Sequence, residues 1–333
     1  MPANAVLGMT WAGGLALLCL AFAAGGSSSK DERTTSAVDR HGRLQVQGTK
    51  IVGRHGQPVS LAGMSLFWSQ WIGKYYTAEA VAWLKKDWQA TIVRAAIAPE
   101  PDGYIQNPEV EMAKAQTVID AAIKEGMYVI VDWHSHTAEK HPEEAVKFFS
   151  DLAKKYGDKP NIIYEIYNEP LKVSWSAVIK PYAERVIKAI RAHDPDNLIV
   201  VGTPTWSQDV EVAAEDPIKD PNVAYTLHFY AGTHKQFLRD KAEKAMAKGI
   251  ALMVTEWGTV NANGDGGVAK ESTEEWLAFM RKHSLTHCNW SLADKVEGAS
   301  VLKPGASTTG GWKDSDLTES GLYVKSIIKG WTK

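Results

Sequence analysis

The chain has 333 residues, of which 44% are hydrophobic and 23% are charged, and these proportions are typical of a globular protein with a large core. Its formal net charge of -2 gives no electrostatic basis for binding nucleic acid or an anionic membrane surface, so we expect neither partner. The 13 tryptophans are unusual, and they either fill the core or offer flat surfaces on which sugar rings stack.

The first residues have features of an export signal. Residues 11–24 are apolar and short for a membrane span, and Ala21-Phe22-Ala23 has the small residues that signal peptidase recognises. No Lys or Arg precedes Trp11, which is unusual for a signal peptide. We expect residues 1–23 to be a cleaved signal peptide, residues 24–42 a flexible linker, and the protein to be secreted, either extracellular or periplasmic. Lipidation at Cys19 is the alternative, which would anchor the protein to a membrane.

Strand patterns run through residues 43–333, which we expect to form a single domain. Glycines separate two short alternating segments, Leu44–Val46 and Val59–Leu61, which predict a small β-hairpin lid before the main domain. Eight apolar runs then predict strands that are buried on both faces, because most of the runs are continuous rather than alternating. These runs are residues 61–66, 91–97, 128–133, 162–167, 198–202, 224–229, 251–256 and 287–292.

Amphipathic segments between these runs predict helices at residues 108–126, 142–157, 176–193, 235–249, 272–283 and 319–331. The first has Pro near its start and Gly at its end, and Ser272-x-x-Glu275 suggests a capping box. Strands that alternate with helices indicate an α/β fold, and eight units indicate a (β/α)8 TIM barrel. An open doubly wound sheet is the alternative, but no glycine-rich phosphate loop follows the first strand.

Polar side chains recur where the apolar runs end. In a (β/α)8 barrel the active site lies at the C-terminal ends of the strands, so these side chains are expected to meet at one face. They are Arg94, Asp132, His134, Asn168, Glu169, Trp206, His228, Tyr230, Glu256, Trp290, Lys295 and Glu297.

Two glutamates end the fourth and seventh runs, Glu169 and Glu256. Side chains at these positions face each other across the barrel mouth. Glycoside hydrolysis needs one carboxyl that protonates the leaving oxygen and a second that attacks the anomeric carbon, about 5–5.5 Å apart in a retaining enzyme. The sequence therefore predicts Glu169 and Glu256 as a catalytic pair.

Five further side chains are predicted to support this pair. Arg94 lies beneath Glu256 and keeps it ionised by lowering its pKa, and Tyr230 holds one of its oxygens. Asn168 donates a hydrogen bond to a sugar 2-hydroxyl. His134 and His228 line the sugar site or orient the acid.

The motif Tyr164–Pro170, followed downstream by Val254–Gly258, resembles glycoside hydrolase family 5, and it is most similar to the endoglucanases of subfamily 2. The resemblance runs from about Arg43 to Trp331. It implies a catalytic (β/α)8 barrel, a retaining endo-β-1,4-glucanase that cleaves internal bonds of cellulose and related β-glucans. Glu169 matches the family's acid/base and Glu256 its nucleophile.

The same resemblance implies a set of residues that bind the glucan chain, namely Trp71, Trp206, Trp290, Lys295 and Glu297. Phe67 stands where some relatives carry a His, so stacking by Phe67 or Trp68 is expected to replace one hydrogen bond. We expect a polysaccharide substrate, a monomer and no stable membrane partner.

Other functions fit parts of the pattern. His134-Ser135-His136 is a possible metal-binding pair, but in metal-dependent barrels such a pair usually ends the first strand, so we predict no metal and no cofactor. A non-catalytic sugar-binding barrel would have no reason to keep both carboxyls. The same mechanism acting on mannan, xylan or mixed-linkage glucan remains the alternative, because the carboxyls do not distinguish these substrates.

Overall fold

The computed structural model describes residues 35–331, so the predicted signal peptide and most of the predicted linker lie outside the described residues. Eight parallel strands close into a barrel in the order β10-β3-β4-β5-β6-β7-β8-β9. Each overlaps one of the eight predicted runs, which confirms the predicted (β/α)8 barrel. The strands are β3 (Ala62–Leu66), β4 (Ile92–Ile97), β5 (Tyr128–Trp133), β6 (Ile162–Glu165), β7 (Leu198–Val201), β8 (Val223–Tyr230), β9 (Leu252–Gly258) and β10 (His287–Leu292).

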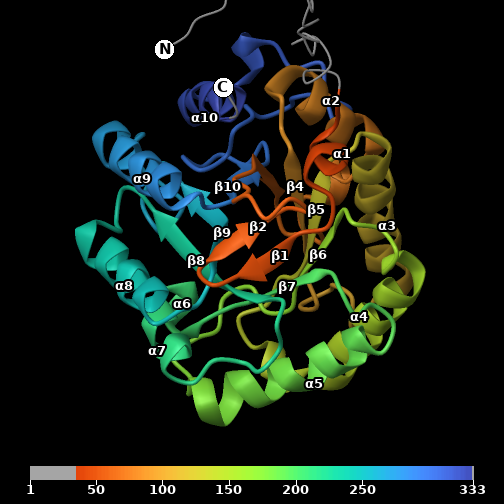
Figure 1. Ribbon diagram of the computed structural model, residues 1–333. Coiled ribbons are helices and arrows are strands. Elements are labelled where there is room, and N and C mark those ends of the chain that lie inside the picture. Colours follow the sequence, from red (N-terminus) through yellow and green to blue (C-terminus); the bar gives the residue numbers. More distant parts are fainter. Residues whose placement is uncertain (1–34, 332–333) are drawn as a thin grey trace, which may run out of the picture. The chain divides into compact units, whose positions relative to one another are not determined.

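Helices surround the barrel (Figure 1). They are α2 (Ala78–Trp88), α3 (Pro108–Lys124), α4 (Pro142–Tyr156), α5 (Lys180–Arg191), α7 (Val210–Glu215), α8 (Gln236–Ala247), α9 (Lys270–His283) and α10 (Glu319–Gly330). The short α6 (Pro204–Ser207) follows β7, and α1 (Ala37–His41), from the end of the predicted linker, belongs to the compact unit that begins at Ser36. No helix within residues 35–331 is long and apolar enough to cross a bilayer.

Two helices of the ring, α2 and α7, were not predicted. Helix α2 buries Ala80, Val81, Leu84 and Trp88 at helical spacing, so its signal was present in the sequence. Helix α7 has six residues, too few to repeat a helical pattern. The predicted capping box was wrong, because α9 begins two residues earlier at Lys270 and Ser272 lies inside the helix.

The N-terminal hairpin lies across one end of the barrel (Figure 1). Its strands are β1 (Gln45–Gln47) and β2 (Lys50–Val52), joined by a two-residue turn in which Gly48 has a φ of 60°. Residues 59–61, predicted as its second strand, instead lead into β3. The backbone N–H of Val46 donates to Asn222, just before β8, at 2.7 Å. The hairpin therefore closes the N-terminal end of the barrel, opposite the end where polar residues gather.

Inside the barrel, an apolar layer rests on this hairpin. It contains Ile51 of the hairpin and one or two residues from most of the strands, among them Ile92, Tyr128, Ile130, Ile163, Val200, Ala224, Met253 and Cys288. Since side chains alternate along a strand, the residues two positions later point to the same interior, one layer nearer the C-terminal end. That rule places Arg94, Asp132 and Glu165 inside the barrel.

Candidate active site

A polar layer fills the C-terminal half of the barrel interior, directly above the apolar layer. It consists of fully buried side chains from neighbouring strands, Ser65, Arg94, Asp132, Glu165, Thr226 and Thr255. Buried charges are costly unless they are paired, so this layer has to be held together by its own ion pairs.

Arg94 is the centre of the polar layer. Its Nε donates to Glu165 Oε2 at 2.7 Å, and its Nη2 lies 2.9 Å from Asp132 Oδ2. Further bonds go to Asn168 Oδ1 at 2.7 Å and to Glu256 Oε2 at 3.0 Å. Burial opposes the charge of Arg94, but three carboxylates outweigh it and hold the pKa of the guanidinium well above its usual range.

Strand β9 presents two consecutive residues to the barrel interior. Thr226 pairs with Met253, but His228 pairs with Glu256, so β9 has one extra residue between the two pairs. Thr255 donates to Glu165 Oε1 at 2.6 Å. Glu256 accepts hydrogen bonds from Arg94 and, at 2.8 Å, from the hydroxyl of Tyr230. The extra residue is what allows Glu256 to reach the site from this strand.

Glu169 lies on the loop after β6. Its backbone N–H donates to the carbonyl of Ser135, at 3.2 Å. Its two carboxylate oxygens each have an imidazole partner: His228 Nδ1 is 2.9 Å from Oε1, and His136 Nε2 is 3.2 Å from Oε2. The sequence pattern pointed to His136 only as half of a metal-binding pair, so this contact was missed.

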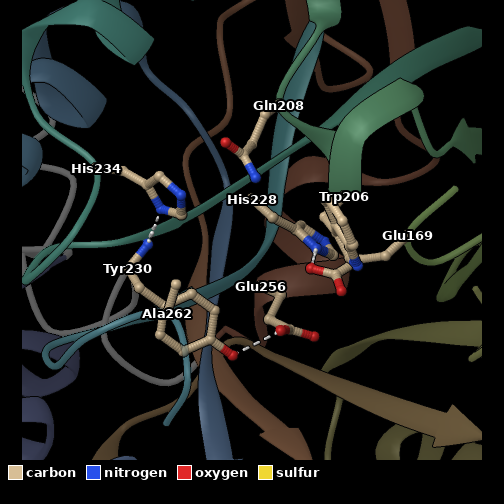
Figure 2. A pocket seen from close by; sticks show the side chains of 8 residues that line it. All are labelled: Glu169, Trp206, Gln208, His228, Tyr230, His234, Glu256 and Ala262. Carbon is tan, nitrogen blue, oxygen red and sulfur yellow. Dashed lines mark hydrogen bonds and ion pairs between the residues drawn. The ribbon is translucent and has the colours of Figure 1, made fainter. Parts of the chain in front are cut away.

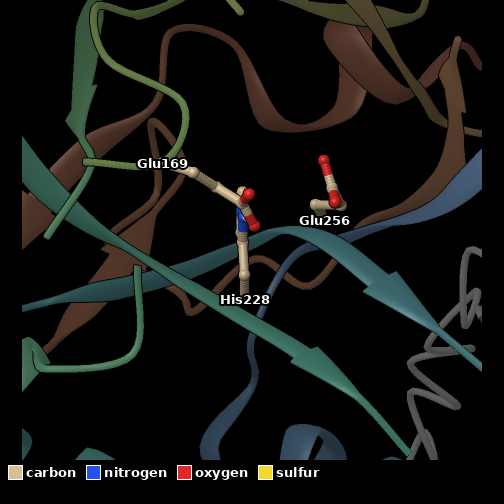
Figure 3. A group of neighbouring side chains, drawn as sticks. All are labelled: Glu169, His228 and Glu256. Atoms are coloured by element: carbon tan, nitrogen blue, oxygen red, sulfur yellow. The ribbon is translucent and has the colours of Figure 1, made fainter. Parts of the chain in front are cut away.

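The carboxyls of Glu169 and Glu256 face the same small space (Figure 3). One carboxylate oxygen of each, together with a ring nitrogen of His228, lie within 4.8 Å of one another. Inverting glycosidases separate their carboxyls by about 6.5–9.5 Å to admit a water molecule, whereas retaining enzymes hold them about 5–5.5 Å apart. The spacing here matches the retaining arrangement.

Protonation in this group differs from the expectation. Burial raises the pKa of Glu169, but hydrogen bonds from His136 and His228 outweigh it and lower the pKa to about 2. Burial lowers the pKa of His228, but its carboxylate partners raise it to about 9. Burial and the charge of Glu169 raise the pKa of Glu256 against the opposing effects of His228, Arg94 and Tyr230. Arg94 does act in the predicted direction, but it does not dominate.

These shifts predict how stability depends on pH. The raised pKa of His228 gives stability that is complete below about pH 6.5 and is lost as pH rises through about 9. The lowered pKa of Glu169 gives stability that is complete above about pH 4.5 and is lost as pH falls through about 2. We expect the free energy of unfolding in urea to fall between pH 6.5 and 9, by an amount on the order of 3 kcal/mol. His228→Asn should flatten this slope; an unchanged slope in that variant would contradict the shift.

His134 and Trp290 form one wall of the site. His134 Nδ1 is 2.7 Å from Asp132 Oδ2, and its ring stacks on Trp290 with the centroids 5.0 Å apart. Burial, with the charge of Arg94, holds the pKa of His134 well below its usual value, so the ring is neutral. Phe67 packs against Trp290 at 5.1 Å, and Lys295, paired with Glu297, lies 5.6 Å from the Phe67 ring.

A hollow of about 260 Å³ opens above the two glutamates (Figure 2). It is lined by Glu169, Trp206, Gln208, His228, Tyr230, His234, Glu256 and Ala262. Trp206 reaches it from a turn in which Thr205, Trp206 and Ser207 have φ values of 59°, 54° and 56°, a left-handed conformation that is uncommon without glycine. The N–H of Trp206 donates to the Pro170 carbonyl at 2.8 Å, so the turn is tied to the loop that carries Glu169.

A second hollow of about 590 Å³ lies on the other side of His136. Its aromatic wall is Trp68 and Trp71, whose ring centroids are 5.0 Å apart, and Trp71 is 58% exposed. Trp71 is therefore separate from the glutamate pair but lies along the same barrel face.

Glu169, His228 and Glu256 could in geometry surround a divalent cation. The chemistry of the three residues does not favour one. A His228 with a pKa of about 9 is protonated at neutral pH, and a protonated imidazole has no lone pair for a metal. Glu256 also already faces the guanidinium of Arg94 at 3.0 Å.

Comparisons with known proteins agree with this geometry. The family model described as cellulase, glycosyl hydrolase family 5, matches residues 52–296. Endoglucanase Z of Dickeya dadantii is 57% identical over 292 residues, covering 86% of this chain, and the chain spans only 66% of that relative's length.

Solved structures are similar over most of the chain. One from Cytophaga hutchinsonii has 54% identity and a TM-score of 0.88, covering 88% of this chain and 96% of the other. The catalytic domain of Thermobifida fusca endoglucanase Cel5A (E5), in complex with cellotetraose, has 34% identity and a TM-score of 0.84, covering 88% and 99%. The chain, with its paired glutamates at the C-terminal end of a (β/α)8 barrel, belongs to the cellulases of glycosyl hydrolase family 5.

Proposed function

We propose that this protein is an endo-β-1,4-glucanase that cleaves internal bonds of cellulose and related β-glucans with retention of configuration. The observation that carries the proposal is the spacing of Glu169 and Glu256, whose carboxylate oxygens approach within 4.8 Å. Similarity to Endoglucanase Z of Dickeya dadantii, and to an endoglucanase solved with cellotetraose, supports the choice of β-1,4-glucan.

The mechanism has two displacements. Glu256, held by Arg94 and Tyr230, attacks the anomeric carbon while Glu169 protonates the leaving sugar oxygen, so a glycosyl-enzyme ester forms and the glycosidic bond breaks. Glu169 then accepts a proton from water, which attacks the same carbon and releases Glu256.

The proton that Glu169 delivers has a source in the free enzyme. His228 is protonated and its Nδ1 lies 2.9 Å from Glu169 Oε1, so the pair carries one proton between them. Transfer along this bond gives a neutral Glu169 and a neutral His228 without bringing a new proton into the site. Asn168, held by Arg94 at 2.7 Å, offers its amide to a sugar 2-hydroxyl.

The glucan chain passes over an aromatic floor in this proposal. Trp206 lines the hollow above the glutamates, Trp290 packs in one cluster with Tyr230, and Trp71 lies with Trp68 in the second hollow. The ion pair of Lys295 and Glu297 reaches this path beside the ring of Phe67. In this proposal Phe67 stacks on a sugar ring at the position where some relatives form a hydrogen bond. We also propose that the protein is secreted and acts as a monomer.

The experiment that tests this function compares soluble substrates. We expect reducing ends to appear rapidly on carboxymethylcellulose and mixed-linkage β-glucan and slowly on mannan and xylan, with viscosity falling early because internal bonds are cut. Proton NMR of the first product should show the β-anomer. Glu169→Gln is the control for contaminating activity. Faster cleavage of mannan or xylan than of carboxymethylcellulose would replace the proposed substrate, and an initial α-anomer would exclude retention.

A further inference from the structure

The carboxyl of Glu169 has a hydrogen-bond partner at each of its two oxygens. One of these partners, His136, takes no part in the proposed reaction. His228 on strand β8 contacts Oε1, whereas His136 on the loop after β5 contacts Oε2. Glu169 itself lies beyond the end of β6, on a loop, so strand pairing does not fix its side chain. With one imidazole alone, the carboxyl group would be freer to rotate about its Cγ–Cδ bond.

The loop that carries His136 is braced from several sides. Thr137 Oγ1 donates to Glu100 Oε1 at 2.9 Å, and His141 Nε2 lies 2.9 Å from the other oxygen of Glu100. The hydroxyl of Tyr167 donates to the backbone carbonyl of His136 at 3.1 Å. The backbone of His136 is therefore held in place, although its side chain is 40% exposed.

We propose that His136 is a positioning residue, which holds the carboxyl of Glu169 in place through the oxygen that His228 leaves free. The inference rests on the proposed function, in which Glu169 protonates the leaving sugar. The ring of His136 also meets Trp68 edge to face, with centroids 5.6 Å apart. His136 thus forms the boundary between the acid and the aromatic hollow of Trp68 and Trp71.

The charges around His136 favour this hydrogen bond. Glu169 after β6 and Glu256 of β9 are the acidic groups that face it, while His228 of β8 and His134, just after β5, are the imidazoles. Burial lowers the pKa of His136, but the hydrogen bond and charge of Glu169 outweigh it and raise the pKa. A protonated His136 makes a charge-assisted bond to the carboxylate, which is stronger than a neutral one.

The test uses the dependence of the rate on the leaving group. Phenyl β-cellobioside needs a proton from the acid, whereas dinitrophenyl β-cellobioside releases a stable anion without one. We expect His136→Leu to lower kcat on the phenyl substrate by about 10- to 100-fold, because a small displacement of a reacting group is costly. The KM of the phenyl substrate should change little. The kcat/KM on the dinitrophenyl substrate should also change little, because it reports formation of the glycosyl-enzyme and not the later hydrolysis, in which Glu169 is the base. His136→Gln, whose amide can donate from a similar position, should recover much of the loss.

Two variants separate this inference from the proposed function. Glu169→Gln should show the same leaving-group pattern in kcat/KM with a larger loss; if it does not, the acid assignment fails, whatever His136 does. His193→Leu, a histidine replacement on the exposed turn after α5, should match wild type on both substrates. An equal loss of kcat/KM on both substrates in His136→Leu, a change confined to KM on the phenyl substrate, or wild-type behaviour while Glu169→Gln is impaired would each overturn the positioning role.

Discussion

Glu256→Ala is expected to lower the kcat on carboxymethylcellulose by roughly 10⁴-fold or more, since a nucleophile acts with its partners as a unit. Azide should restore turnover of dinitrophenyl β-cellobioside, because a small anion fits the space that the carboxyl leaves. It attacks from the face that Glu256 occupied, in a single displacement, so the product should be the α-glycosyl azide. The fold should persist, because Arg94 keeps Glu165 and Asp132 as partners.

Glu169→Ala provides the matched comparison. The glycosyl-enzyme still forms from the dinitrophenyl substrate, and azide then attacks it without needing a base. The product should therefore be the β-glycosyl azide. Glu271→Ala, on the exposed side of α9, controls for loss of a carboxylate and should behave as wild type. Identical azide products from the two active-site variants, or none from either, would refute the division of roles between Glu169 and Glu256.

Arg94→Met is expected to lower the free energy of unfolding by about 3–5 kcal/mol and to abolish activity, because it leaves buried carboxylates without a cation. Its stability should also respond to pH in a distinctive direction. Unpaired buried carboxylates bind protons more tightly in the folded state, so the variant should gain stability as pH falls from 7 to 5. Urea unfolding at several pH values measures both effects.

A control and a partial rescue accompany the Arg94 measurement. Arg185→Met removes an exposed guanidinium that pairs with Glu143, and it should change stability by no more than about 0.5 kcal/mol. Adding Glu165→Gln to Arg94→Met should recover part of the lost stability by removing one uncompensated charge. If Arg94→Met were as stable as Arg185→Met, the polar layer would not depend on its central cation.

The barrel and the glutamate pair were predictable because both follow from local patterns. Strand runs buried on both faces stand out as continuous apolar segments, and strand ends in a (β/α)8 barrel converge at one face. Because Glu169 and Glu256 lie at the ends of two strands, their carboxyls were expected to lie together at that face, and they do. Helix α2 could also have been found, from Ala80, Val81 and Leu84 at helical spacing.

The polar layer beneath the pair was harder to predict, although Glu165 gave a signal by interrupting an apolar run. Its partners depend on which strands lie next to each other and in which register, and neither property is local. The same limitation applies to His136, whose contact with Glu169 joins two loops 33 positions apart. The pKa directions followed from these contacts, so the expectation that Arg94 would dominate Glu256 omitted burial and the charge of Glu169.

The extra residue of β9 makes the reactive geometry depend on how many residues the strand contains, as well as on which ones. Without it, the alternation that carries Met253 and Thr255 into the barrel would turn Glu256 outward, toward the helices, and every side chain in the site could be present while no carboxyl faced Glu169. Transfer of this chemistry to another barrel therefore requires copying the spacing of the backbone before copying any side chain.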